Sequence, residues 1–142
     1  MIRLMTIEDY DSVYLLWSET KGMGLRSLDD SKEGIEKFLK RNPTTSFVSE
    51  IDGEIAGVIL CGHDGRRGYI YHTAVKQSQR GKGIGKELIK CAYKALESEG
   101  ITKGALVVFK TNEIGNSFWK SQGWQKRDDL NYYSKPFDLN NR

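Results

Sequence analysis

Residues 75–86, V-K-Q-S-Q-R-G-K-G-I-G-K, lie between an apolar run at 69–75 and a helical pattern at 84–98. Three glycines and three cations therefore gather where a strand is expected to turn into a helix: Gly81, Gly83, Gly85, Arg80, Lys82 and Lys86. Glycine allows backbone conformations that other residues avoid and lets a ligand come close to the main chain. The free N–H groups at a helix start, together with the helix dipole, attract anions. The stretch therefore predicts a phosphate-binding loop.

Two common phosphate-binding motifs do not fit this loop. A Walker loop requires G-x-x-x-x-G-K-[ST], whereas Gly81 and Gly85 are too close together and Glu87 follows Lys86. A dinucleotide fingerprint requires G-x-G-x-x-G, and here the third glycine comes one residue too early. The stretch from Arg80 to Gly85 fits R-x-x-G-x-G completely. The loop alone leaves open a glycine-rich basic turn that binds no ligand.

Length, composition and charge indicate a soluble globular protein. We expect the 142 residues to form a single domain, residues 1–142, with 38% hydrophobic and 29% charged residues. No apolar run approaches the roughly 18 residues of a membrane span. The net charge of +3 is too small, and its cations too dispersed, to favour a nucleic-acid partner. Cys61 and Cys91 lack metal-ligand spacing, so we expect no metal, buried free thiols and a cytoplasmic location.

Hydrophobic periodicity predicts the element order β-α-α-β-β-β-α-β-α-β-β. A cap at Thr6 to Asp9 and another at Asp30 or Ser31 begin the first two helices, and Asn112 caps the last. Hairpin connections followed by one crossover helix predict a mixed, mainly antiparallel sheet of the α/β (α+β) class, with one parallel pair. The expected strands are 2–5, 46–51, 54–61, 69–75, 103–109, 124–126 and 130–137; the expected helices are 10–19, 31–42, 84–98 and 112–122.

The loop and this order of elements resemble the GCN5-related N-acetyltransferase (GNAT) superfamily, in the form of a small bacterial single-domain member. A second motif carries the resemblance further. The family commonly shows N-x-x-A-x-x-x-Y-x-x-x-G-F, and this chain has Asn112, Gly115, Trp119, Gly123 and Trp124 at those positions. The resemblance covers essentially the whole chain. It implies a sheet whose central strands splay apart, with acetyl-CoA as cosubstrate in the gap.

The resemblance also implies which residues bind acetyl-CoA. Backbone groups of the strand before the loop would pair with the pantetheine arm, and N–H groups of the loop would surround the pyrophosphate. Nearby lysines would add positive charge, the side chain of Asn112 would bond the pantetheine, and Trp119 would pack on it. The implied set is Thr73, Ala74, Val75, Lys76, Arg80, Gly81, Lys82, Gly83, Ile84, Gly85, Lys86, Asn112 and Trp119.

Two positions depart from the catalytic residues that the family uses. Trp119 stands where many members carry a tyrosine proposed as the general acid, and an indole N–H is a far poorer acid than a phenol. Val107 stands where one subgroup carries a glutamate base. The resemblance assigns oxyanion stabilisation to the backbone amide of Val75. The proton acceptor has two equal candidates, Tyr71 and His72, and a water chain without a dedicated base is also open.

Strand alternation predicts how these candidates face. Tyr69, Tyr71 and Thr73 would share one face of the strand, and Ile70 and His72 the other. A bulge, which is usual at this place in the family, would shift that register.

The sequence therefore predicts an acetyl-CoA-dependent N-acetyltransferase that acetylates a primary amine of a small molecule or peptide by direct attack on the thioester. The alternative is a catalytically silent acyl-CoA-binding sensor or interaction module. A nucleotide-phosphate binder of another fold is a third, weaker interpretation. The resemblance implies acetyl-CoA and an amine acceptor as partners, allows a homodimer, and gives no reason to expect nucleic acid or a membrane.

Overall fold

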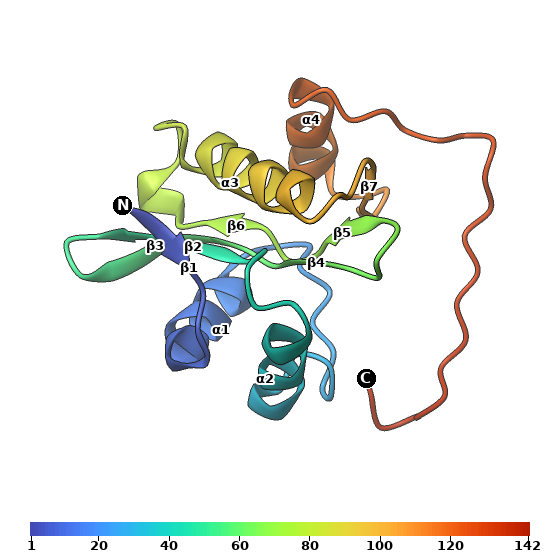
Figure 1. Cartoon of the computed structure of the whole chain (residues 1–142), viewed down its shortest axis with the longest axis horizontal. Coiled ribbons are helices and arrows are strands. Elements are labelled where there is room, and N and C mark those ends of the chain that lie inside the picture. The colour runs from blue at the N-terminus through green and yellow to red at the C-terminus, as the bar shows by residue number, and fades with distance from the viewer.

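The computed structural model describes residues 1–142 and places a bent sheet between two pairs of helices (Figure 1). Helices α1 (Tyr10–Glu19) and α2 (Lys32–Arg41) cover one face, and α3 (Ile84–Ser98) and α4 (Glu113–Ser121) lie on the other. Single helical turns, η1 (Ile7–Asp9) and η2 (Gln77–Gln79), precede α1 and the glycine loop. The strands are β1 (Ile2–Leu4), β2 (Phe47–Ile51), β3 (Glu54–Ile59), β4 (Cys61–His63), β5 (Gly68–Ile70), β6 (Ala74–Val75) and β7 (Gly104–Ala105).

The helix starts follow from local side-chain caps. The hydroxyl of Ser31 accepts a hydrogen bond from the Gly34 N–H at 3.0 Å, and Asn112 Oδ1 accepts one from the Gly115 N–H at 2.9 Å. Each cap satisfies an N–H that a helix leaves free in its first turn. The predicted extents of α1 and α3 are confirmed.

The strands form two hydrogen-bonded groups, ordered β1-β2-β3-β6 and β4-β5-β7. All pairs are antiparallel except β5 with β7, which flank α3 and run parallel. The mixed, mainly antiparallel sheet with one parallel pair is therefore confirmed. The β2–β3 hairpin turns at Asp52 and Gly53, which both have positive φ.

A bulge interrupts the strand between β5 and β6. Ile70 pairs with Cys61 and Ala74 pairs with Val58, so the two residues at 59–60 face the three residues at 71–73. One extra residue bends the strand and breaks its ladder. Beyond the bulge, β6 pairs only with β3, whereas β5 pairs with β7. The outer edge of β6 is thus unpaired, and the expected splay of the central strands is confirmed.

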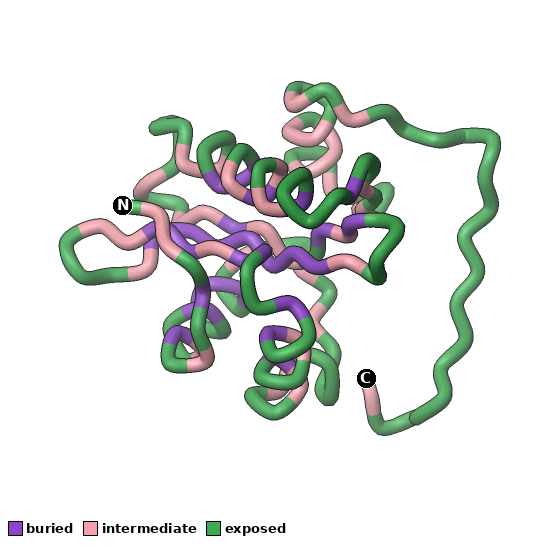
Figure 2. The backbone as a smooth tube through the Cα atoms, viewed as in Figure 1, coloured by how far each residue is buried: buried purple, intermediate pink, exposed green.

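Each face of the sheet has its own apolar core (Figure 2). Under α1 and α2, the core includes Trp17, Ile35 and Val58, with Trp17 and Val58 fully buried. Under α3, it includes Leu88 and Ile70. These two cores fix α1, α2 and α3 against the sheet, so the strands between them present the gap in a defined place.

The closing strands predicted at 124–126 and 130–137 are wrong, and the strand predicted at 103–109 is reduced to β7. Residues 125–140 are exposed throughout and run as an extended segment that pairs with no strand (Figures 1 and 2). The short β7 offers almost no ladder for another strand to join, and Pro136 lacks a donor for one. The chain instead returns to the loop before α2, where the Ser27 N–H donates to the Arg142 carbonyl at 2.8 Å.

Candidate active site

The glycine loop presents an uninterrupted row of unused backbone donors. Gly81 and Gly83 have φ values of +81° and +82°, conformations that side chains other than glycine rarely adopt. None of the six N–H groups from Gly81 to Lys86 donates a hydrogen bond within the protein. The last three open α3, whose dipole adds partial positive charge there. Nothing lies within 4 Å of a Cβ built on Gly81 or Gly83, so a ligand has room to reach these donors.

The unpaired edge of β6 lies directly before this loop. The Lys76 N–H donates to the Ala56 carbonyl of β3 at 2.8 Å. Because N–H groups alternate along a strand, the Val75 N–H points away from β3 and into the gap. On this gap-facing side the Val75 carbonyl accepts a hydrogen bond from Arg80 Nε at 3.0 Å. The gap therefore offers a free main-chain donor beside a main-chain acceptor that Arg80 already contacts.

A cavity of about 2080 Å³ joins the loop, the gap and the α1–α2 side of the sheet. Most of the predicted site residues lie in its wall: Tyr71, His72, Thr73, Ala74, Val75, Arg80, Gly81, Gly83, Ile84, Gly85, Lys86, Asn112 and Trp119. The structure does not bring Lys76 and Lys82 into this wall. Lys76 pairs with Glu54 at 3.5 Å, and Lys82 Nζ donates to Gln79 at 2.8 Å.

The α4 side of the gap is formed by the second motif. Asn112 caps α4 through its Oδ1, and its Nδ2 lies against Gly22, where an added Cβ would approach to 2.7 Å. The Trp119 ring meets the Trp124 ring edge to face at a centroid distance of 5.4 Å. Trp119 is thus a packed wall of the cavity, with one face shared with the core under α3.

The bulge changes the faces that strand alternation predicts. Ile70 packs under α3, but the His72 ring meets Trp17 of α1 at 5.0 Å in an edge-on arrangement. The expectation that Ile70 and His72 share a face is therefore wrong, because the extra residue at 71–73 shifts the register. Tyr71, whose ring lies 4.6 Å from that of Tyr69, packs against Phe38 of α2 and so lies on the same side of the sheet. The two candidate proton acceptors, Tyr71 and His72, thus lie on the same side of the sheet.

The tyrosines stay protonated at neutral pH. Burial, reinforced by the nearby Tyr132, raises the pKa of Tyr69 to about 12. Burial also raises the pKa of Tyr71, with smaller contributions from Tyr132 and the carboxylate of Asp29. Phe38 closes this wall edge-on to Tyr71 at 5.6 Å. A neutral phenol donates hydrogen bonds, so Tyr71 is suited to donating a proton and unsuited to accepting one.

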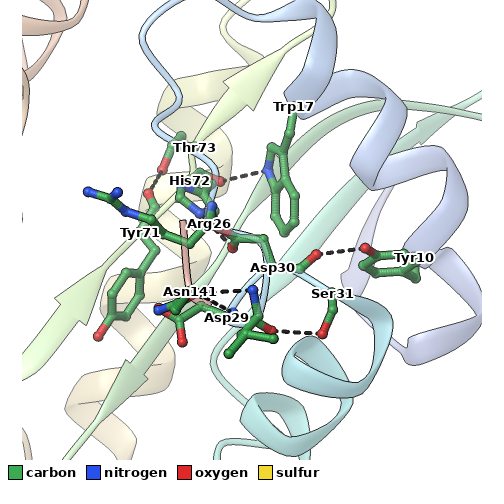
Figure 3. Close-up of polar contacts among 11 residues, drawn as sticks. Tyr10, Trp17, Arg26, Asp29, Asp30, Ser31, Tyr71, His72, Thr73 and Asn141 are labelled. Carbon is green, nitrogen blue, oxygen red and sulfur yellow. Dashed lines mark hydrogen bonds and ion pairs between the residues drawn. The ribbon is translucent and has the colours of Figure 1, made fainter. Parts of the chain in front are cut away.

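Asp30 is the site residue that sequence reasoning missed. It was expected only as a possible helix cap, but Ser31 is the cap. The Asp30 carboxylate is almost fully buried and lies 2.8 Å from His72 Nε2 (Figure 3). No local pattern could reveal this contact, since 42 residues separate the partners.

The split sheet and the exposed row of backbone donors are features of an acyl-CoA-dependent transferase, and comparison with known proteins agrees. The sequence profile of the acetyltransferase (GNAT) family matches residues 10–124. An acetyltransferase of Sodalis glossinidius is 32% identical over 129 residues, which cover 91% of this chain and 89% of the relative. This chain therefore belongs to the GNAT acetyltransferase family, and it is an acetyl-CoA-dependent N-acetyltransferase.

Solved structures share the fold at low sequence identity. The PaiA N-acetyltransferase of Thermoplasma acidophilum, in complex with coenzyme A, has a TM-score of 0.77 at 21% identity, covering 99% of this chain and 94% of that one. The aminoglycoside N-acetyltransferase AAC(6')-Iy, in complex with a bisubstrate analogue, has a TM-score of 0.76 at 18% identity, covering 96% and 97%. In this chain no helix is long and apolar enough to cross a bilayer.

Proposed function

We propose that this enzyme acetylates a primary amine of a small molecule or peptide by direct attack on the thioester, using the cleft between β6 and the start of α4. The observation that carries the proposal is the row of six unused N–H groups from Gly81 to Lys86, placed next to the unpaired edge of β6. A diphosphate would satisfy the row, and an amide-bearing arm would satisfy the edge. A ligand that carries phosphate but no amide-bearing arm would use only the row of N–H groups and would leave the edge of β6 unpaired.

Each part of the chain has a separate task in binding. The loop from Arg80 to Gly85 surrounds the diphosphate with backbone donors, and Lys86 in the cavity wall adds positive charge. The edge of β6 pairs with the arm as an added strand would. Acetyl-CoA supplies an activated acetyl carbon and a thiol leaving group. The chain itself supplies position, which converts an encounter of two molecules into an oriented contact.

The Val75 N–H is the donor for negative charge that develops on the carbonyl oxygen. It points into the gap and is held there by the pairing of Lys76 with β3. A fixed backbone donor in a site shielded from water stabilises such charge without having to reorient during the reaction.

The amine acceptor enters from the α1–α2 side of the cavity. This wall carries the ring of Tyr71, which contacts the rings of Phe38 and Tyr69. It also carries charged side chains of both signs, among them Arg26 and Asp29. We place the reaction in the cytoplasm, because both cysteines, the buried Cys61 included, are free thiols. A reducing compartment keeps thiols in that form.

A thiol-release assay tests the proposal. The purified chain is incubated with acetyl-CoA and three amines: spermidine, kanamycin and a peptide with a free N-terminal alanine. We expect free coenzyme A to appear with at least one amine well above the rate of hydrolysis. Release with none of them, while acetyl-CoA still raises the melting temperature, would make the chain a silent binding module.

A second measurement separates the third interpretation. We expect acetyl-CoA to raise the melting temperature more than ATP does at the same concentration, since only acetyl-CoA carries the arm that fits β6. Better protection by ATP would identify a nucleotide-phosphate site instead.

A further inference from the structure

The space between β5, β6 and the start of α2 holds a pair of titratable side chains that are built into the fold. His72 lies in the bulge, and Asp30 lies one residue before the cap of α2. Their side chains are only 15% and 4% exposed, yet both residues line the cavity. A buried carboxylate is costly to maintain unless its oxygens are bonded.

Both carboxylate oxygens of Asp30 are occupied. Oδ1 lies 2.8 Å from His72 Nε2, and Oδ2 accepts the backbone N–H of Arg26 at 2.6 Å (Figure 3). The ionised carboxylate only accepts hydrogen bonds, so Nε2 must carry the hydrogen. In the neutral ring the free lone pair is then on Nδ1.

Nδ1 of His72 is left without a partner in the protein. It makes no hydrogen bond within the protein, whereas every fully buried side-chain nitrogen or oxygen has a partner. This nitrogen is therefore accessible, and the residue that bears it is in the cavity wall.

Helix α1 contacts both members of the pair. The Trp17 Nε1–H donates to the His72 carbonyl at 3.2 Å, and the two rings meet edge-on at 5.0 Å. The Tyr10 hydroxyl donates to the Asp30 carbonyl at 2.6 Å. Helix α1 thus fixes the backbone of both partners, and their side chains keep one geometry (Figure 3).

We infer that His72 is the catalytic residue that accepts the proton of the amine, through Nδ1, and that Asp30 is the positioning residue that sets its tautomer. This inference rests on the proposed acetyl transfer. His72 precedes Val75 by three residues, so its backbone lies within about 10 Å of the oxyanion donor. Tyr71 does not compete for the role, because its phenol stays protonated at neutral pH.

The protons and electron pairs of this step balance. An ammonium acceptor gives one proton to Nδ1 of His72 and becomes a neutral amine. The amine nitrogen forms a bond to the acetyl carbon, and the carbonyl electron pair moves onto the oxygen that the Val75 N–H faces. When the carbonyl forms again, the carbon–sulfur bond breaks and its electron pair leaves on sulfur. The nitrogen then loses its second proton, which neutralises the thiolate. Nδ1 returns its proton to solvent, so the sum is an amide, a thiol and one released proton.

The first test uses His72→Gln, with His63→Gln as its matched control. His63 is the other histidine of the chain, lies away from the cavity, and has its Nδ1 bonded to the Gly65 N–H. With acetyl-CoA and the fastest amine of the panel, we expect H72Q to lower kcat by about 100-fold or more. The KM for acetyl-CoA should stay within about twofold, since His72 is not in the loop. H63Q should leave both unchanged. An H72Q enzyme with at least a third of the normal kcat would overturn the inference.

The second test reads the tautomer without any acceptor. In ¹⁵N-labelled protein only two histidine rings contribute, and H63Q assigns them. We expect the neutral His72 ring to show a protonated Nε2 and a bare Nδ1; a protonated Nδ1 would refute the assignment. In Asp30→Asn this preference should weaken, and kcat should fall by about tenfold or more at unchanged KM for acetyl-CoA. If D30N does not fold, H72Q and the wild-type spectrum decide. A wild-type enzyme inactive with every amine would instead overturn the proposed function.

Discussion

Replacing Gly83 by alanine separates the role of the glycine loop in folding from its role in binding. Gly83 has a φ of +82°, and Gly53, in the β2–β3 turn far from the cavity, has a φ of +78°. Nothing lies within 4 Å of a Cβ built on either residue. The left-handed conformation costs a side chain about 1 kcal/mol. We therefore expect G83A and G53A to lower the free energy of unfolding of the free protein equally, by about 1 kcal/mol.

Binding of acetyl-CoA should distinguish the two variants. A methyl group on residue 83 keeps a phosphate oxygen from at least one N–H, and losing a charged hydrogen bond costs about 2 kcal/mol. This corresponds to a Kd about 30-fold weaker. At a ligand concentration 100 times the wild-type Kd, acetyl-CoA stabilises the wild type by about 2.7 kcal/mol and G83A by about 0.9 kcal/mol.

The assay is thermal unfolding with and without acetyl-CoA. For a domain of this size, 1 kcal/mol corresponds to about 3 °C in Tm. The ligand should therefore raise Tm by about 8 °C for the wild type and for G53A, and by about 3 °C for G83A. Equal ligand-induced shifts in G83A and G53A would refute the assignment of the loop to the diphosphate. A much lower Tm for free G83A than for free G53A would refute the premise of equal strain.

Three further predictions concern stability. Burial opposes ionisation of Asp9, but hydrogen bonds from Arg3 and a backbone N–H outweigh burial and lower the pKa of Asp9. Asp9→Asn should therefore lower the free energy of unfolding at neutral pH by about 2 kcal/mol, as measured by urea titration. That stability is present above the unfolded pKa of about 3.9 and is lost as the pH falls through the lower folded pKa, so the difference between the variant and the wild type should shrink as the pH is lowered through that range. Asn112→Ala and Ser31→Ala each remove a helix cap and should each cost about 1 kcal/mol, but calorimetry should show weaker acetyl-CoA binding for N112A only. Leu88→Ala, at a fully buried position, should lower Tm by about 9 °C, corresponding to about 3 kcal/mol; a change under 1 kcal/mol would contradict the core described under α3.

The sequence predicts best those features that depend on near neighbours. The glycine loop and α3 can be predicted because the turn residues, the helical period and the cap all lie within residues 81–98. The caps at Ser31 and Asn112 can be predicted in the same way, because each lies next to the helix that it caps. The gap beside β6 followed from family resemblance, and the structure adds its cause, a bulge against β3 and β4.

Other features depend on partners far away in the chain. The contact of Asp30 with His72 depends on where the loop before α2 meets the bulge, which no local pattern encodes. The segment 130–137 has the residue types of a strand, yet a strand also needs an edge to join. The two-residue β7 does not supply one, so this segment stays extended and exposed.

The bulge at 71–73 makes the number of residues in this strand as important as their identity. If one codon were deleted there, Ile70 and Ala74 could keep Cys61 and Val58 as partners in an uninterrupted ladder, and the bend that separates β5 from β6 would be lost. Point substitutions would leave the number of residues between Ile70 and Ala74 unchanged. We therefore expect in-frame deletions within this tripeptide to be purged during evolution even where each of its residues tolerates exchange.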